Sequence, residues 1–386
     1  TPISLTRDPG YFSPNADGVL DTIAFSPEIP VTEGIKEWQL DVLSQDSVTV
    51  RVFSGSAAPP DQIVFDGTDD QGTTLPEGSY SGAISVLYTN GNNPKASAPE
   101  FLLDLTSPSV SLRRDQSVFS PNGDGSKDEL TIYQLGSLEE LWTGVITDAD
   151  GSPARSFTWR GAPEEKVVWD GRDETGNTAM NGSYIYTLSV RDRAGNYTEA
   201  ASRPFLVDVR ETPVELAVDG SAFSPNRDGS KDTIALRPGV TDPEGVAELR
   251  VRVLDQDDLE VRSYTVEEVI DEIIWDGFGE TARAVSDGEY SVELTVLYEN
   301  GNTPTAKAGP IIVDTEFPSV EVSVDNPFFS PDGDGKRDYL PVNQTGATEE
   351  VLWTSAILDA DQSPVRSFVW PRRVQSFAWD GSDEDG

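Results

Sequence analysis

The sequence predicts an all-β protein, a string of tandem antiparallel β-sandwich domains. One decapeptide, Phe-Ser-Pro-Asn/Asp-x-Asp-Gly-x-x-Asp, recurs with copies that begin at residues 12, 119, 223 and 329. Spacings of 104 to 107 residues indicate a tandem array. Between the copies, apolar and polar residues alternate with period two and are interrupted by Gly, Asp and Pro turns, a pattern typical of half-buried strands.

The repeats also set the domain boundaries. A chain of 386 residues suits three to four domains of about 100 residues each. Each repeat opens with a proline and a short alternating segment, such as residues 213–218. The predicted units are repeat 1 (1–106), repeat 2 (107–211), repeat 3 (212–316) and repeat 4 (317–386, truncated). Because the chain starts at Thr1 and stops in mid-repeat at Gly386, we expect it to be a piece of a longer protein.

Two kinds of repeat alternate along the chain. Residues 87–94 of repeat 1 recur as residues 297–304 of repeat 3, both with a Leu-Tyr-x-Asn-Gly-Asn core. Residues 141–153 of repeat 2 recur as residues 352–364 of repeat 4. Repeats 1 and 3 are therefore assigned to a type A and repeats 2 and 4 to a type B, which gives an A-B-A-B string.

Repeat 2 illustrates the expected order of elements. The decapeptide lies on a loop between the first two strands, and the Asp-Gly pair at residues 150–151 lies between alternating runs, a strong hairpin signal. The expected strands of this repeat are residues 108–112, 129–133, 141–146, 155–159 and 184–190.

A second signature, an aromatic residue followed by Asp-Gly, begins at Phe65, Trp169, Trp275 and Trp379. In the first three repeats an x-Gly-x-Tyr motif follows it, at residues 77–80, 181–184 and 287–290. The aromatic ring is predicted to fill the core and the Asp-Gly to turn the chain, and a carbohydrate-stacking ring is the alternative. Asp170 and Asp173 could form a second ligand pair, but Asx turns are favoured because repeat 3 has Gly279 in the place of Asp173.

The decapeptide carries the candidate metal site. Oxygen-bearing side chains stand at its positions four, six and ten, and glycine at position seven. Such oxygens beside a glycine turn suit calcium, although the spacing is shorter than that of an EF-hand loop. A metal-free Asx turn is the alternative. The calcium interpretation assigns as ligands Asn15, Asp17, Asp21, Asn122, Asp124, Asp128, Asn226, Asp228, Asp232, Asp332, Asp334 and Asp338.

The composition excludes several classes of site and partner. The chain has no cysteine and no histidine, which removes disulfides, thiolate sites, the usual zinc ligand and the usual general base. With 68 acidic and 28 basic residues, the net charge of −40 repels nucleic acid and anionic lipid. This charge suits cation binding or a high-salt environment outside the cell. Alternatively, it only keeps the surface solvated and prevents non-specific association. No apolar run of about 18 residues is present to cross a membrane.

Short connectors join the repeats. In residues 207–213 and 313–318 a last strand runs directly into the next proline, so the connectors are expected to be semi-rigid. Asp104, Asp208 and Asp314 recur at these places. These residues could bind a cation between two domains. The favoured interpretation is that each Asp bonds a turn at the end of its strand.

Three segments of repeat 2 carry a family resemblance. Residues 169–177, 181–188 and 190–196 resemble the Ig-like domain of bacterial flagellar hook-capping (FlgD-like) proteins, which recurs in large bacterial surface proteins. The decapeptide is similar to the start of gliding-motility-associated, type IX secretion C-terminal domains. The resemblance implies Ig-like sandwiches of about seven strands. The Arg-Ala-Gly-Asn ending is found in repeat 2 alone, and four copies in series argue against a sorting role.

The predicted function is non-enzymatic, with no catalytic residues. The resemblance implies an exported bacterial cell-surface or appendage protein, with the repeats as a calcium-stabilised stalk whose partners are other Ig-like domains of the same longer chain. A carboxylate-dependent glycoside hydrolase is disfavoured because the acidic residues belong to the repeated scaffold. The alternative is an adhesin that binds a surface protein or glycan through an exposed aromatic patch, for which Tyr88 and Tyr298 are the candidates.

Overall fold

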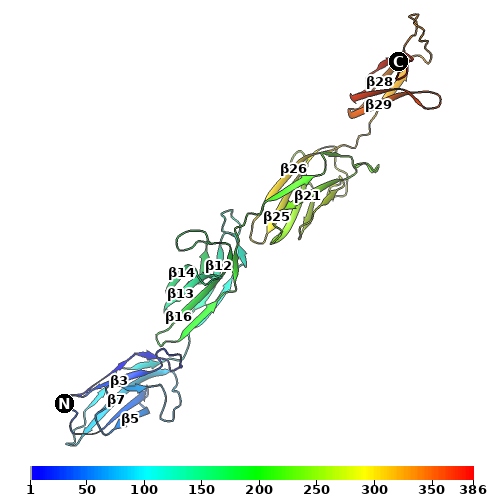
Figure 1. Cartoon of the computed structure of the whole chain (residues 1–386). Coiled ribbons are helices and arrows are strands. Elements are labelled where there is room, and N and C mark those ends of the chain that lie inside the picture. The colour runs from blue at the N-terminus through cyan, green and yellow to red at the C-terminus, as the bar shows by residue number, and fades with distance from the viewer. Residues whose placement is uncertain (1) are drawn as a thin grey trace.

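The computed structural model describes residues 2–386 and consists of four β-sandwich units that follow one another along a line (Figure 1). All regular elements of this range are strands. Each sheet pairs strands from within one repeat. The prediction of tandem antiparallel sandwiches in an elongated string is confirmed. In residues 2–386 there is no helix with the length and apolarity to cross a membrane.

Repeat 1 shows the plan of the sandwich. One sheet has the order β1-β3-β6, and the other has the order β2-β9-β7-β4-β5 with β8 paired to β7. Both sheets are antiparallel except for the parallel pairing of β2 with β9. The strands are β1 Ser4–Asp8, β2 Tyr11–Phe12, β3 Ile23–Glu28, β4 Ile35–Ser44, β5 Thr49–Gly55, β6 Ile63–Phe65, β7 Gly78–Tyr88, β8 Lys95–Ser97 and β9 Phe101–Leu103.

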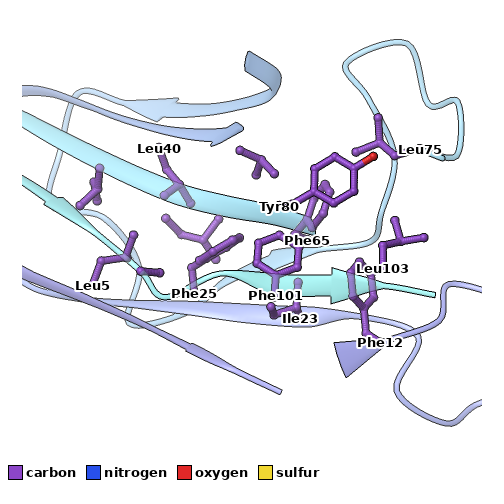
Figure 2. Close-up of a cluster of buried hydrophobic side chains, with 14 of the residues drawn as sticks. Leu5, Phe12, Ile23, Phe25, Leu40, Phe65, Leu75, Tyr80, Phe101 and Leu103 are labelled. Atoms are coloured by element: carbon purple, nitrogen blue, oxygen red, sulfur yellow. The ribbon is translucent and has the colours of Figure 1, made fainter. Parts of the chain in front are cut away.

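The core of repeat 1 lies between these two sheets (Figure 2). Alternate residues of β7 are buried, as period two requires. Phe12, Phe25, Phe65 and Phe101 meet with ring centroids 5.6 to 6.0 Å apart and tilted or edge-on rings, a geometry that favours aromatic pairs. The aromatic core therefore supplies cohesion in a chain without disulfides.

Repeats 2 and 3 follow the same plan, each with its own core. Repeat 2 contains β10 Val110–Arg114, β11 Val118–Phe119, β12 Leu130–Gly136, β13 Glu139–Asp148, β14 Pro153–Gly161, β15 Lys166–Trp169, β16 Gly182–Arg191, β17 Tyr197–Ala201 and β18 Phe205–Val207. Repeat 3 contains β19 Val214–Val218, β20 Ala222–Phe223, β21 Ile234–Val240, β22 Val246–Leu254, β23 Glu260–Val266, β24 Ile273–Trp275, β25 Gly288–Tyr298 and β26 Thr305–Val313.

The first three repeats have more strands than the expected seven because the first strand is interrupted in each of them and the last strand in repeats 1 and 2. Pro9 separates β1 from β2, which pair with different sheets. Pro99 and Pro204 separate the two halves of the last strand in repeats 1 and 2. Proline has no N–H for the ladder, which suits these three breaks. The break between the first two strands recurs without a proline in repeats 2 and 3, at residues 115–117 and 219–221.

Repeat 4 is an open sandwich. Its sheets have the orders β27-β28-β31 and β29-β30, so β29 lacks the neighbour that β16 provides to β13 in repeat 2. Trp353 and Trp379 are half-buried, and Val342 is the one apolar side chain of residues 317–386 that is buried. Its strands are β27 Glu321–Val324, β28 Leu340–Thr345, β29 Glu350–Leu358, β30 Pro364–Arg372 and β31 Phe377–Trp379.

We expect repeat 4 of this chain to open at the lowest free energy. A core with few buried contacts and an open sheet edge offers little resistance to local unfolding. Hydrogen exchange should therefore be faster in β29 than in β13, whose Leu-Trp-Thr sequence is the same. Equal protection of the two strands would contradict this expectation.

Candidate functional site

The decapeptide folds into a loop that its own side chains close. In repeat 2, the Asp128 carboxylate accepts hydrogen bonds from the N–H groups of Gly123 (2.6 Å) and Gly125 (2.8 Å). Asp124 accepts from the N–H of Ser126 (2.8 Å), and the Asn122 amide oxygen accepts from the N–H of Asp124 (3.0 Å). The other three copies make the same set of bonds. These are the Asx-type turns that the residue pattern allows.

The predicted metal ligands therefore fall into four separate clusters, one for each loop. The last Asp of each loop is half-buried, and most of the other ligands are exposed. In the fourth loop, the carboxylate oxygens of Asp332, Asp334 and Asp338 lie within 4.8 Å of one another. Calcium binds oxygens at about 2.3–2.6 Å, so one ion of that size could reach all three. The first three loops offer two carboxylates and one amide oxygen each.

The two sequence signatures, about 50 residues apart, meet in space. The glycine of each aromatic-Asp-Gly motif has positive φ and lies under the proline of the decapeptide. A Cβ added to Gly171 would lie 2.6 Å from Pro121 Cβ, and Gly67, Gly277 and Gly381 face Pro14, Pro225 and Pro331 in the same way. The decapeptide is therefore anchored to the end of its own sandwich.

The aromatic residue of the second signature is buried in the first three repeats, as predicted. Phe65, Trp169 and Trp275 are at most 1% exposed. The carbohydrate-stacking alternative is therefore wrong for these three rings, because a ring enclosed by the core cannot stack on a sugar. Asp173 accepts from the N–H groups of Thr175 and Asn177, which is the favoured Asx turn.

Repeat 1 contacts repeat 2 through its decapeptide loop. Asn196, in the hairpin after β16, is 1% exposed. Its amide oxygen accepts from Ser13 Oγ (2.7 Å) and Asn15 Nδ2 (3.2 Å), and its Nδ2 donates to the Asp104 carbonyl (3.0 Å). Arg191 and Asp17 also form an ion pair of 3.6 Å across this boundary. One side chain of repeat 2 therefore binds both the loop and the connector of repeat 1.

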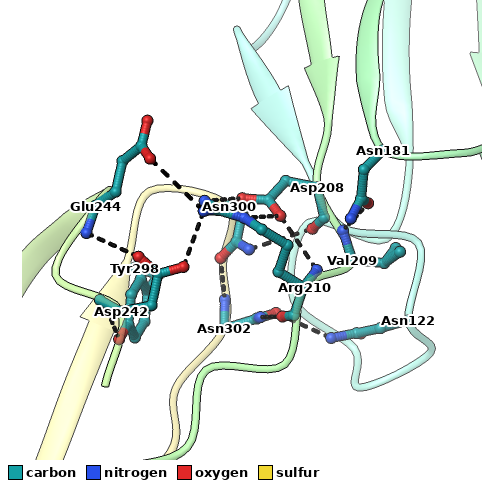
Figure 3. A network of polar contacts seen from close by, with 10 residues as sticks. All are labelled: Asn122, Asn181, Asp208, Val209, Arg210, Asp242, Glu244, Tyr298, Asn300 and Asn302. Atoms are coloured by element: carbon teal, nitrogen blue, oxygen red, sulfur yellow. Dashed lines mark hydrogen bonds and ion pairs between the residues drawn. The ribbon is translucent and has the colours of Figure 1, made fainter. Parts of the chain in front are cut away.

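The boundary between repeats 2 and 3 is built in the same way (Figure 3). Asn122 Nδ2 donates to the Asn302 amide oxygen (2.9 Å), and Asn302 Nδ2 donates to the Arg210 carbonyl (3.1 Å). Asn300 Nδ2 donates to the Asp208 carbonyl (3.2 Å), and Lys127 Nζ donates to a carbonyl of repeat 3. We call this arrangement of decapeptide loop, connector and following hairpin tip a joint.

The connectors are held at both joints by the repeat that precedes them. Asp104 and Asp208 each accept a hydrogen bond from the N–H two residues further on, and Asp314 does the same after repeat 3. These are the favoured strand-end turns. The first residue of each x-Gly-x-Tyr motif accepts a hydrogen bond from the connector that follows. The Glu77 carboxylate accepts from the N–H of residue 105 (2.8 Å), and the Asn181 amide oxygen accepts from the N–H of residue 209 (2.7 Å).

Electrostatics differ between the two joints. The Arg210 guanidinium, which bonds Asp208 at 2.9 Å and pairs with Asp242 of repeat 3 at 2.9 Å, lowers the pKa of Asp208. At the first joint, burial raises the pKa of Asp104, and the charges of Asp192 and Glu77 raise it further. Asp208 therefore favours the folded joint when it is ionised, whereas ionised Asp104 opposes it.

The two joints should respond to acid with opposite signs. The ordinary pKa of both groups is 3.8. Asp104, with its raised pKa, should add stability as the pH falls from 7 through its folded pKa towards 3.8. Asp208, with its lowered pKa, should lose its contribution only as the pH falls below 3.8 through its folded pKa. The pH dependence of each joint can be measured by hydrogen exchange at its connector. The parent chain is compared with the Asp104→Asn and Asp208→Asn variants. Identical pH profiles in parent and variant would contradict it.

The sequence analysis did not identify the buried tip asparagines of the joints, Asn196, Asn300 and Asn302. Type A and type B repeats differ in their endings, yet Asn92, Asn196 and Asn302 all follow a positive-φ glycine at the same distance from the x-Gly-x-Tyr motif. This shared Gly-Asn pair was the available signal. Asn302 is 9% exposed.

The proposed exposed aromatic patch is wrong. Tyr298 is 2% exposed and donates to the Asp242 carbonyl, and Tyr88 is half-buried and donates to the Val31 carbonyl. Both rings pack against the core of their own repeat, and each hydroxyl bonds a loop of that same repeat.

Comparisons with known proteins add structural neighbours of low similarity. No family model and no curated protein matched the chain. A tetra-tandem repeat from the extending region of a large adhesion protein has 15% identity and a TM-score of 0.30, covering 99% of this chain and 91% of that one. A structure from a 1.5-MDa bacterial ice-binding adhesin has 16% identity and a TM-score of 0.33, covering 82% of this chain and 99% of that one. The chicken CNTN1 FN1-FN3 domains have 12% identity and a TM-score of 0.30, covering 81% and 98%. TM-scores and identities this low do not establish the architecture, which is defined by the strand pairings of the chain itself.

Proposed function

We propose that this chain is a spacer in an exported bacterial cell-surface or appendage protein, where it holds other Ig-like domains of the same longer chain at a set distance. The observation that carries the proposal is the joint. The same side-chain types bind the same loop and connector at both boundaries between complete repeats. Short connectors with bonded side chains restrict bending, which is what a spacer requires.

The resemblance to hook-capping Ig-like domains belongs to this proposal. It supports an exported, non-enzymatic role for the repeats. The acidic side chains of the decapeptides accept hydrogen bonds from their own backbone in all four copies, which suits a structural duty. With Tyr298 buried, the adhesin alternative has no specific observation in its favour.

The spacer function can be tested by the shape of the full chain in solution. Small-angle scattering should give the maximum dimension of a straight rod, and spin-label distances across each joint should be narrowly distributed. The chain has no cysteine, so label sites can be introduced without background. A compact particle, or broad distances at both joints, would reject the function.

Calcium remains a proposal of its own. A cation bound between Asp332, Asp334 and Asp338, or by the corresponding groups of the other loops, would neutralise clustered carboxylates and stabilise the native state by mass action. The fourth loop has one more carboxylate than the others and should bind most tightly.

Thermal unfolding of the full chain should therefore shift upward with calcium and downward with chelator. Asp124→Ala should remove the dependence of repeat 2 and leave the other repeats unchanged. If calorimetry detects no heat at millimolar calcium and chelator leaves the melting temperature unchanged, the loops are held by Asx turns alone.

A further inference from the structure

The hairpin tip of repeat 1 is built like a tip that receives a neighbour. In repeat 3, the N–H of Gly301 donates to the Tyr298 carbonyl (3.0 Å) and the N–H of Asn302 to the Asn300 amide oxygen (3.0 Å). In repeat 1, Gly91 and Asn92 make the corresponding bonds at 2.9 and 3.0 Å. The two tips therefore share one backbone geometry.

The two tips differ in whether a preceding repeat packs against them. A Cβ added to Gly301 would lie 2.9 Å from the Ser126 carbonyl of the preceding repeat, whereas no described atom lies within 4 Å of the same position on Gly91. Asn302 is buried, and Asn92 is exposed. Within residues 2–386 the Asn92 side chain has no hydrogen-bond partner, so both its donor and its acceptor are free.

We propose that the tip of repeat 1, residues 89–92, is the receiving half of a further joint, and that its partner is a type B sandwich joined ahead of residue 1. This inference rests on the proposed spacer function. Asn92 would accept from the decapeptide Asn of that repeat and donate to its connector, as Asn302 does with Asn122 and Arg210. Asn90 would bind a connector carbonyl, as Asn300 does.

The chemistry of the joint identifies this partner. The Asn-Gly-Asn tip occurs in repeats 1 and 3, and repeat 3 follows a type B repeat. Glu33 stands in repeat 1 where Glu244 lies 3.7 Å from Arg210, so a connector arginine would find an acidic partner there. Val31 replaces Asp242, so that arginine would have one acidic partner fewer in repeat 1 than in repeat 3.

A second copy in trans fits less well. Half of the acceptors at the existing joints are connector carbonyls, which reach the tip because the connector is covalently attached to the receiving repeat. A contact of one loop with one hairpin is also far smaller than a stable interface between separate chains, and a tether offsets this by raising the effective concentration.

The test extends the full chain with a second copy of residues 107–211 ahead of residue 1. Spin labels are placed across the new joint and, in a separate sample, at the matching positions across the joint of repeats 2 and 3. We expect equally narrow distance distributions, and hydrogen exchange in residues 88–94 slowed about tenfold, as one or two added hydrogen bonds would give. Asn92→Ala should broaden the new distribution, and the control Asn93→Ala, at an exposed neighbouring position, should leave it narrow.

Three outcomes would overturn the inference. The first is a broad distance distribution across the new joint together with a narrow one across the joint of repeats 2 and 3. This result would reject the further joint and leave the spacer function supported. A narrow distribution that survives Asn92→Ala shows that the tip is not the contact. Concentration-dependent dimerisation of the unextended chain that Asn92→Ala abolishes would assign the tip to a second copy.

Discussion

Replacing Asn196 with alanine should release repeat 2 from repeat 1 without unfolding either. The side chain is 1% exposed and bonds Ser13, Asn15 and the Asp104 carbonyl across the joint. Each of these bonds contributes about 1 kcal/mol, and groups left buried without partners add their desolvation cost, so the joint should lose roughly 2–4 kcal/mol. That is enough to turn a fixed orientation into a flexible one.

Spin-label distances between repeats 1 and 2 measure this release. The distribution should be narrow in the parent chain and broad in Asn196→Ala, while the unfolding of each repeat core changes little. Asn92→Ala is the matched control, because it removes the same residue type from the same tip position where the side chain is exposed. A narrow distribution in Asn196→Ala would show that the connector alone sets the orientation.

Gly171→Ala should destabilise repeat 2 by roughly 2–4 kcal/mol, since two costs combine. The glycine has a φ of 71°, in the left-handed region that disfavours a Cβ. The added Cβ would also lie 2.6 Å from Pro121 Cβ and 3.3 Å from the Phe119 ring, both in the decapeptide. Pro121 would have to move, and the decapeptide loop would move with it.

The matched control is Gly176→Ala in the same loop. Gly176 has a φ of 86°, and no described atom lies within 4 Å of its added Cβ. It should therefore show the backbone cost alone, about 1–2 kcal/mol. Denaturant unfolding of both variants separates the terms, and equal losses would show that the contact with Pro121 carries no energy.

The decapeptide shows what local sequence determines. Its Asn, Asp and Gly residues close the loop through bonds between residues two to five apart, so the same turns form in all four copies. The alternation of β7 and β16 likewise follows from period two, which places every second side chain in the core. The fold class and the burial of Trp169 and Trp275 were therefore predictable from the sequence.

The joints depend on contacts that no local pattern contains. Asn196 lies more than 180 residues from Ser13 and Asn15 along the chain, and it reaches them because two folded sandwiches present their ends to each other. The burial of Tyr88 and Tyr298 was likewise not predictable from local sequence. Each hydroxyl donates to a carbonyl more than 50 residues away along the chain, that of Val31 and of Asp242 respectively. The sandwiches and their closing turns follow from local sequence, because their bonds and patterns join residues that are close along the chain. The polar side chains buried between repeats cannot be inferred in this way, because their burial requires two folded surfaces to meet.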